Sequence, residues 1–131
     1  MNLENILITG SSGLVGAPLV TKLLNKSNLI VGIDPVINSE CNENYKHISI
    51  PLNNVEDVTN LLEKYDITKI IHTGGISGPM LANENPNLII ENNIFFTMYL
   101  IEAARIYKKI NRFIFCSSVS AYGELVESDT T

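Results

Sequence analysis

The sequence predicts an α/β fold, with a parallel sheet covered by helices on both faces. Five short apolar runs with strand character alternate with segments of helical periodicity, and the first run ends in a glycine-rich turn that opens into a helix. Strands that alternate with helices in this way form a doubly wound parallel sheet with right-handed crossovers. We expect one domain, because 131 residues suffice for one core and are too few for two.

The first predicted strand, 6–8, leads into a turn with three glycines, and apolar residues at helical spacing follow from Leu14 onward. In a strand–turn–helix of this kind Gly10 permits the tight turn, Gly13 lets a pyrophosphate approach the backbone, and Gly16 lets the helix pack closely on the strand. The N–H groups and dipole at the helix N-terminus attract the anion. The stretch therefore predicts a dinucleotide-phosphate site, with a plain structural turn as the alternative.

The second predicted strand, 29–34, ends in Asp34, which lies 18 residues beyond Gly16. A dinucleotide-binding βαβ unit places there the carboxylate that accepts hydrogen bonds from the adenosine ribose. Since the same carboxylate would repel a 2′-phosphate, the sequence predicts NAD in preference to NADP. The alternative is a solvated acid at a strand end before Pro35.

The rest of the chain continues the alternation, with further strands and helices predicted at 47–50, 55–62, 67–72, 86–109 and 112–116. Asn53 or Asn54 is expected to cap the helix at 55–62. The fourth strand ends at a second glycine cluster, Gly74-Gly75, which a parallel sheet places at the same carboxyl edge as the first. The helix at 86–109 is apolar over more than one face, which predicts a subunit interface or a further layer.

Composition argues against several classes of function. The net charge of −5 disfavours nucleic acid, and no apolar run approaches the ~18 residues of a membrane span. The first residues enter a strand directly, so we expect no secretory leader. Cys41 and Cys116 lie far apart and match no metal-ligand spacing, so we expect free thiols in the cytoplasm and no metal site.

Taken together, these residues resemble the N-terminal portion of the extended short-chain dehydrogenase/reductase family, the NAD-dependent sugar epimerases and dehydratases. The motifs occur in the family's order over nearly the whole chain: Thr9-Gly10-x-x-Gly13-x-x-Gly16, Asp34, Ile71-His72-x-Gly74-Gly75, Asn93, Leu100-Ile101-Glu102-Ala103-Ala104-Arg105 and Ser117-Ser118 with Tyr122-Gly123. The resemblance implies a Rossmann-type sheet, apparently truncated after the fifth strand. Residues 1–131 would then form an incomplete NAD-binding domain without the substrate-binding C-terminal region.

The resemblance also implies a mechanism and a set of site residues. In this family a Ser or Thr, here Ser118, hydrogen-bonds the reacting hydroxyl or carbonyl, and a Tyr from a later Tyr-x-x-x-Lys motif is the general acid/base. The nicotinamide gives or takes the hydride. His72 is expected to be a structural histidine rather than a base or ligand. The residues expected to bind the cofactor are Gly10, Ser12, Gly13, Leu14, Val15, Gly16, Asp34, Leu52, Gly74, Gly75, Ile76, Asn93 and Cys116.

Two of the departures from the family pattern bear directly on the predicted site. Thr131 follows Ser118 by only 13 residues, before the Tyr-x-x-x-Lys motif can occur, so we expect little or no turnover by this chain alone. The string Tyr65-x-x-x-Lys69 has the spacing, but it precedes Ser118 and its Lys begins a strand. Where the family carries an Asp that touches adenine, this chain has Pro51, which offers neither a side-chain acceptor nor an N–H.

Two functions therefore remain open at the level of sequence. The leading hypothesis is the NAD-binding portion of an epimerase/dehydratase-type oxidoreductase or isomerase that acts on a nucleotide sugar or related polyol, as a cytoplasmic homodimer formed through helix 86–109. The alternative is a short non-catalytic module that binds a nucleotide or a partner protein. Oligomeric state and solubility discriminate between them, because a fragment should aggregate through exposed apolar surface and an evolved module should give one defined species.

Overall fold

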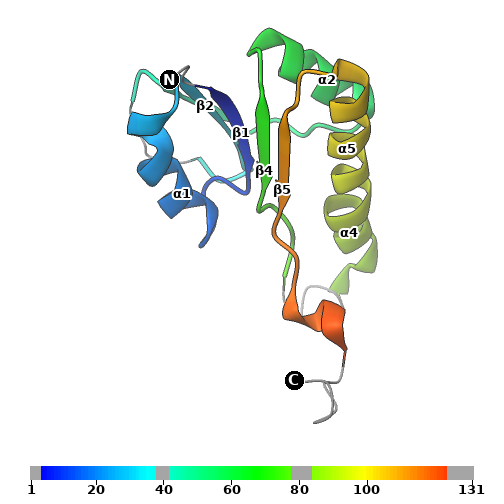
Figure 1. The fold of residues 1–131 in the computed structure, drawn as a ribbon. Coiled ribbons are helices and arrows are strands. Elements are labelled where there is room, and N and C mark those ends of the chain that lie inside the picture. Colours follow the sequence, from blue (N-terminus) through cyan, green and yellow to red (C-terminus); the bar gives the residue numbers. More distant parts are fainter. Residues whose placement is uncertain (1–3, 38–41, 78–83, 124–131) are drawn as a thin grey trace, which may run out of the picture.

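The computed structural model describes residues 4–37, 42–77 and 84–123. Five parallel strands form one sheet in the order β3-β2-β1-β4-β5, which confirms the predicted doubly wound α/β architecture (Figure 1). The strands are β1 (Asn5–Thr9), β2 (Leu29–Ile33), β3 (Tyr45–Ile48), β4 (Lys69–His72) and β5 (Arg112–Phe115). Because β1 pairs with both β2 and β4, the first strand of the chain is the centre of the sheet.

Helices lie on both faces of this sheet (Figure 1). One face carries α1 (Gly16–Leu23) and its 3₁₀ extension η1 (Leu24–Lys26). The other face carries α2 (Val55–Lys64) and a long helical segment composed of α4 (Pro86–Ile90), the π-helical turn η2 (Glu91–Phe95) and α5 (Phe96–Tyr107). A short 3₁₀ helix, η3 (Val119–Tyr122), follows β5.

Alternate residues of the central strands feed two separate cores, because successive side chains of a strand point to opposite faces. Leu7 of β1 packs with Val58 and Leu62 of α2 and Leu100 of α5. Ile8 points the other way and packs with Val20 of α1. Strands buried on both faces need continuous apolar sequence, which is why β1 and β2 read as unbroken apolar runs.

The first helix begins at Gly16, which corrects the expectation that it starts at Leu14. Residues 10–13 close a turn with a hydrogen bond from Gly13 N to Gly10 O of 3.0 Å, and Leu14 precedes the helix with 95% of its side chain exposed. Apolar spacing alone does not separate a loop residue that faces solvent from the first residue of a buried helical stripe.

The third strand also lies two residues earlier than the predicted 47–50. Tyr45 pairs with Ile30 of β2, and its phenol is buried directly over Gly32, where a Cβ would collide with the hydroxyl. This aromatic–glycine contact sets the register, and a local sequence pattern does not reveal it. The other strands agree with prediction to within two residues at each end, and Asn54 caps α2 by accepting from Asp57 N at 2.8 Å.

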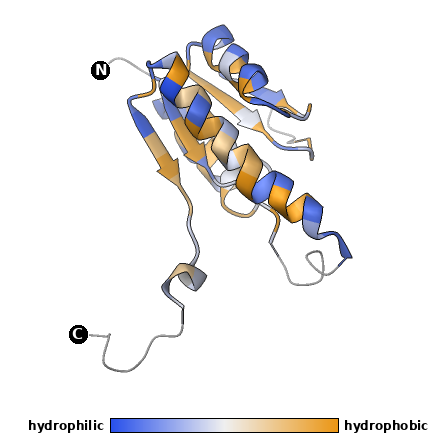
Figure 2. Ribbon diagram, turned by 90° about the vertical axis from the view of Figure 1, so that its right-hand side faces the viewer, coloured by the Kyte–Doolittle hydropathy of each residue, from blue (hydrophilic) through white to orange (hydrophobic). Residues whose placement is uncertain are grey.

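The helix predicted at 86–109 is interrupted by the π-helical turn and ends at Tyr107, where Lys108 adopts a left-handed conformation (φ 63°). Hydrophobic positions recur along its whole length (Figure 2). We call its solvent-exposed apolar residues the outer stripe; they are Leu88, Ile90, Ile94, Phe95, Met98, Ile101 and Ile106. A helix that only covered a sheet would not carry them.

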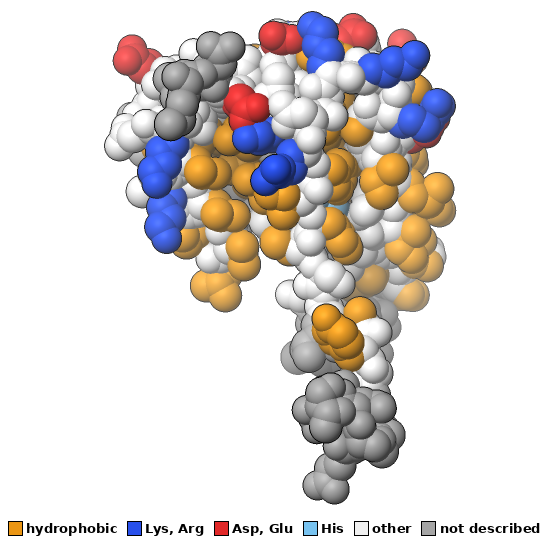
Figure 3. All heavy atoms as spheres, in the orientation of Figure 1, with side chains coloured by type: hydrophobic (Ala, Val, Ile, Leu, Met, Phe, Trp, Pro, Cys, Tyr) orange, Lys and Arg blue, Asp and Glu red, His pale blue; other side chains and the backbone are white. Residues whose placement is uncertain are grey.

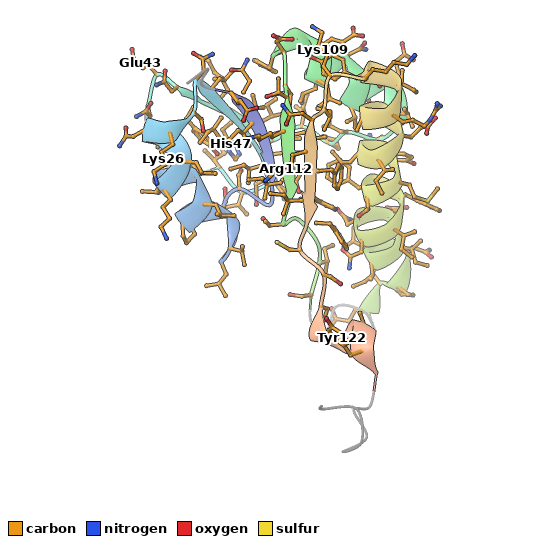
Figure 4. The ribbon with its side chains drawn as sticks, in the orientation of Figure 1. Lys26, Glu43, His47, Lys109, Arg112 and Tyr122 are labelled. Atoms are coloured by element: carbon orange, nitrogen blue, oxygen red, sulfur yellow. The ribbon has the colours of Figure 1, made fainter. Side chains whose placement is uncertain are left out.

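Strand β5 forms one edge of the sheet, and its side chains are largely exposed. Ile114 and Phe115 are 42% and 54% exposed, and Arg112 lies at the start of the strand (Figure 4). Among the described helices, none combines the length and apolar character that crossing a bilayer requires.

Candidate functional site

Three loops meet where the parallel strands end. The glycine-rich turn follows β1, Asp34 follows β2, and the segment 73–77 follows β4. In Figure 1 the strands run downward, and Figure 3 shows that charged side chains gather mainly at the top of the molecule while apolar side chains dominate below. Ligands of open α/β sheets bind at this carboxyl edge.

The glycine-rich turn is shaped by close backbone contacts. Gly10 has φ +66° and donates its N–H to Ile33 O at 2.8 Å, which ties the turn to the end of β2. A Cβ on Gly10 would lie 2.7 Å from the Cα of Gly74, and one on Gly16 would overlap the carbonyl oxygen of Gly10. Gly10 and Gly16 therefore occupy positions that no larger residue fills without a shift, while Gly13 faces solvent.

Asp34 is oriented by the turn itself. Its Oδ2 accepts the N–H of Ser12 at 3.1 Å and its Oδ1 accepts the N–H of Val36 at 2.9 Å, while the Ser12 hydroxyl donates to Val36 O at 2.6 Å. The residue is only 9% exposed. Because a carboxylate has about four lone-pair sites, each oxygen can accept one more hydrogen bond.

Exposed apolar side chains flank this carboxylate. Leu14 and Val15 lie in the turn, and Val36 and Ile37 follow Asp34, with exposed fractions of 95%, 51%, 66% and 76%. Ligand sites commonly combine apolar walls with a few placed polar groups, and the arrangement at this edge fits that description.

A second hydrogen-bond group supports Asp34 from β3, and sequence reasoning missed it. His47 Nε2 lies 3.0 Å from Asp34 O, and its Nδ1 lies 3.1 Å from the Tyr45 hydroxyl, which also reaches Ser11 Oγ at 3.3 Å. His47 thus joins β3 to the end of β2 (Figure 4). The alternation of Tyr45 and His47 along one strand was the only signal, and it has no meaning until the strand's neighbours are known.

The loop after β4 is fixed against the turn and the π-helical segment. Gly74 N donates to Thr9 Oγ1 at 3.1 Å, and the Thr73 hydroxyl donates to Thr9 O at 2.7 Å. Asn93 accepts from Ile76 N at 2.7 Å and donates to Ile76 O at 2.8 Å. The predicted residues Gly74, Ile76 and Asn93 are therefore brought together with Gly10, and Gly75 lies beside the Asn93 side chain.

His72 is buried and hydrogen-bonded through both ring nitrogens, as expected of a structural histidine. Nδ1 lies 2.5 Å from Thr9 Oγ1, and Nε2 lies 2.8 Å from Thr97 Oγ1. The rings of Phe96 and Phe115 pack against the imidazole, with centroids 5.9 and 5.5 Å away. Burial lowers the pKa of His72 below its ordinary value, which favours the neutral ring.

The remaining predicted residues are Cys116, Ser118 and Leu52. Cys116 donates its N–H to His72 O at 3.1 Å, which places it directly after β5, and its side chain is exposed. Ser118 is exposed and caps η3 by accepting from Ser120 N at 3.2 Å, and Tyr122 lies at the end of that short helix (Figure 4). Leu52 packs against the core on the α2 face and lines a cavity of about 290 Å³ there.

Tyr65 and Lys69 lie outside this site. Tyr65 is the C-cap of α2, directly after Lys64, and Lys69 starts β4, where it forms an ion pair with Glu4 at the amino end of the strands. Cys41 falls outside the described residues. Within 4–37, 42–77 and 84–123, no three His, Cys, Asp or Glu side chains gather closely enough to hold a metal ion.

Curated relatives are similar to this chain over most of its length. An uncharacterised protein of Methanocaldococcus jannaschii is 32% identical over 94% of this chain and 42% of its own length. UDP-glucose 4-epimerase of Pisum sativum is 27% identical over 92% of this chain and 38% of its own length. The chain thus spans about two fifths of these relatives.

Solved structures share the fold. Uronate dehydrogenase from Agrobacterium tumefaciens superposes with a TM-score of 0.72 at 25% identity, over 90% of this chain and 42% of that one. UDP-glucose 4-epimerase from Thermotoga maritima, solved with UDP-glucose, superposes with a TM-score of 0.80 at 24% identity, over 94% of this chain and 41% of that one. The second likeness is evidence of fold alone.

The sequence model of the NAD dependent epimerase/dehydratase family matches residues 6–131, from the first strand to the last residue. This match includes the glycine-rich turn, Asp34 and the segment 73–77, the three parts that the structure brings to one edge of the sheet. The resemblance inferred from the motifs is thereby confirmed, and the chain belongs to the NAD dependent epimerase/dehydratase family.

Proposed function

We propose that this chain binds NAD at the carboxyl edge of its sheet and supplies the cofactor-binding part of an enzyme that acts on a nucleotide sugar or related polyol. The observation that carries the proposal is the joint position of the glycine-rich turn and Asp34. The turn leaves no room for side chains at Gly10 and Gly16, and the carboxylate is held against the turn by Ser12 N.

The residues at this edge fit a dinucleotide in three respects. The N-terminus of α1 follows the turn and favours a pyrophosphate. Asp34 retains acceptor capacity for two ribose hydroxyls. The exposed side chains of Leu14, Val15, Val36 and Ile37 offer apolar contact to the nucleoside.

Asp34 supports a preference for NAD over NADP. Its carboxylate accepts two backbone N–H groups and is largely buried. A 2′-phosphate at the ribose would bring a second negative charge next to it. Repulsion at short range in a partly desolvated site is strong enough to discriminate between the two cofactors.

Calorimetric titration of the 131-residue chain with NAD and NADP tests the proposal. We expect NAD to bind at least about tenfold more tightly, which corresponds to ~1.4 kcal/mol. Asp34→Asn should weaken NAD binding and bring the two affinities together, whereas Glu63→Gln on α2 removes one exposed acid away from the site and should change neither. Absence of NAD binding would leave the partner-binding module as the better hypothesis.

We further propose that Ser118 contacts the reacting hydroxyl or carbonyl of the substrate. When bound, the nicotinamide supplies or accepts the hydride. Ser118 lies three residues beyond the end of β5 and its hydroxyl is exposed, so it is accessible to a small molecule at the carboxyl edge. Family membership supports a nucleotide sugar as the substrate. The proposed location is the cytoplasm, where reducing conditions keep an exposed thiol such as that of Cys116 unpaired.

A homodimer formed through the outer stripe is the proposed assembly. The stripe spans the length of α4, η2 and α5, and its members are 37–57% exposed. Sedimentation equilibrium should give a dimer for the wild-type chain and a monomer for Met98→Glu. Ile50→Glu, at an exposed apolar position after β3, is the control and should remain dimeric.

A further inference from the structure

An unbroken chain of hydrogen bonds runs through His72 and links three segments of the site. Gly74 N lies 3.1 Å from Thr9 Oγ1, and Thr9 Oγ1 lies 2.5 Å from His72 Nδ1. On the other side of the ring, His72 Nε2 lies 2.8 Å from Thr97 Oγ1, which donates to Asn93 O at 2.8 Å.

For the neutral ring that burial favours, one placement of protons satisfies every contact in this series of hydrogen bonds. The N–H of Gly74 donates to Thr9 Oγ1, and Thr9 still has its own proton to give to His72 Nδ1. Thr97 gives its single proton to Asn93 O, so it must accept the proton carried by His72 Nε2. His72 is therefore the neutral Nε2–H tautomer, with one ring nitrogen accepting and the other donating.

The partners of His72 lie next to the candidate cofactor contacts. Thr9 immediately precedes Gly10. Gly10 and Gly74 lie so close together that a Cβ on Gly10 would crowd the loop after β4, and a Cβ on Gly74 would crowd the glycine-rich turn. On the opposite side, Thr97 is bonded to the π-helical turn whose Asn93 holds Ile76. The imidazole thus spans the gap between the glycine-rich turn, the loop after β4 and the long helix.

We propose that His72 is a positioning residue that fixes the glycine-rich turn and the segment 73–77 at the separation one dinucleotide requires. The proposal rests on the proposed function, because the ligand that needs this separation is NAD. His72 itself is 1% exposed and shielded by Phe96 and Phe115, so it acts through Thr9 and Thr97 and does not touch the cofactor.

A matched pair of threonine variants tests the proposal. Thr97 and Thr59 each donate to the carbonyl four residues earlier in a helix, at 2.8 Å, but only Thr97 also accepts from a histidine. Thr97→Val should weaken NAD binding about tenfold, whereas Thr59→Val should leave it within about twofold. Thr97→Ser keeps the hydroxyl and should restore affinity. Equal NAD affinity of Thr97→Val and Thr59→Val, both folded by circular dichroism, would overturn the proposal.

His72→Gln removes the hydrogen bond between Thr9 and His72 and is the variant to use if Thr97→Val does not fold. The glutamine amide can still donate to Thr97 but places no acceptor at Thr9, so the same loss of affinity is expected. Imidazole ¹⁵N spectra of the wild-type chain give a readout that a general packing role would not move. They should show the proton on Nε2, and a proton on Nδ1 would contradict the mechanism.

The two levels of the hypothesis fail in different ways. If the wild-type chain does not bind NAD, the proposed function fails, and backbone amide shifts then decide the positioning role. Thr97→Val should move the amide resonances of Gly10, Gly74 and Ile76, and Thr59→Val should leave them unchanged. If these amides do not respond, the positioning role is wrong.

Discussion

Asn93 grips the main chain of Ile76 with both ends of its side-chain amide, accepting from the N–H at 2.7 Å and donating to the carbonyl at 2.8 Å. Seventeen residues separate the two, and the contact pins the loop after β4 to the π-helical turn. An amide is the one neutral side chain that supplies a donor and an acceptor in this geometry.

Asn93→Leu should therefore destabilise the chain by about 1–3 kcal/mol, because both main-chain groups of Ile76 lose their partner in a half-buried position. Urea denaturation gives the free energy of unfolding. The control is Asn92→Leu, since the Asn92 amide makes one exposed contact, to Leu88 O. If Asn93→Leu lowers the free energy of unfolding no more than Asn92→Leu does, the loop after β4 does not depend on the two hydrogen bonds between Asn93 and Ile76.

Gly16→Ala and Gly13→Ala should separate stability from binding. A methyl group at position 16 overlaps the carbonyl oxygen of Gly10, so this variant should lose stability as well as NAD binding. A methyl group at position 13 makes a tight contact of 3.2 Å with the same oxygen but does not overlap it, so this variant should lose less stability than Gly16→Ala while NAD binding weakens. Equal melting temperatures for the two variants would contradict the close packing.

The stability of the chain should fall as the pH drops below about 6.5. Burial holds the pKa of His72 below the ordinary 6.5, so the unfolded chain takes up the proton first and acid favours unfolding. The groups packed on the imidazole are Thr9, Thr97, Phe96 and Phe115, none of which titrates in this range. The contribution of the neutral His72 ring to the free energy of unfolding is fully present above the His72 pKa of the unfolded chain. It is lost as the pH falls toward the lower His72 pKa of the folded chain.

Urea denaturation at a series of pH values measures this dependence. In His72→Gln the slope near pH 6 should shrink, whereas His47→Gln, which removes the other histidine, should retain it. An identical slope in wild type and His72→Gln would mean that His72 does not couple protonation to folding.

Asn54→Ala should cost about 1 kcal/mol of stability, because the Asn54 side chain caps α2 by accepting from Asp57 N. The neighbouring Asn53 contributes its backbone N–H to Asp57 and is exposed, so Asn53→Ala should have little effect. Thermal unfolding of the two variants distinguishes the cap from its neighbour, and similar losses would refute the assignment.

Much of the fold and the core of the candidate site follow from local sequence. The cap of α2 joins residues three positions apart. The three glycines and the acid 18 residues beyond Gly16 form a fixed pattern along the chain, so spacing and residue type predict these features. The exposed position of Leu14 was not predictable in the same way, because its apolar side chain matches the helical period although it precedes the helix.

The parts that sequence did not reveal depend on contacts between distant segments. Tyr45 sets the register of β3 through its contact with Gly32. His72 is hydrogen-bonded to Thr9, 63 residues away in sequence, and to Thr97, 25 residues away. The π-helical turn accommodates Asn93 against Ile76, and nothing in the apolar periodicity of that helix marks an extra residue per turn. Such features emerge only once the sheet order is fixed.

The central place of β1 has a consequence for how the chain folds. Its residues pair on one side with β2, beginning at Leu29, and on the other with β4, beginning at Lys69. A ribosome therefore makes β1 before either of its neighbours, and the second neighbour, β4, begins 60 residues after β1 ends. Parallel pairing between remote segments is slow, so the early apolar strand stays open to chaperones and to aggregation during synthesis.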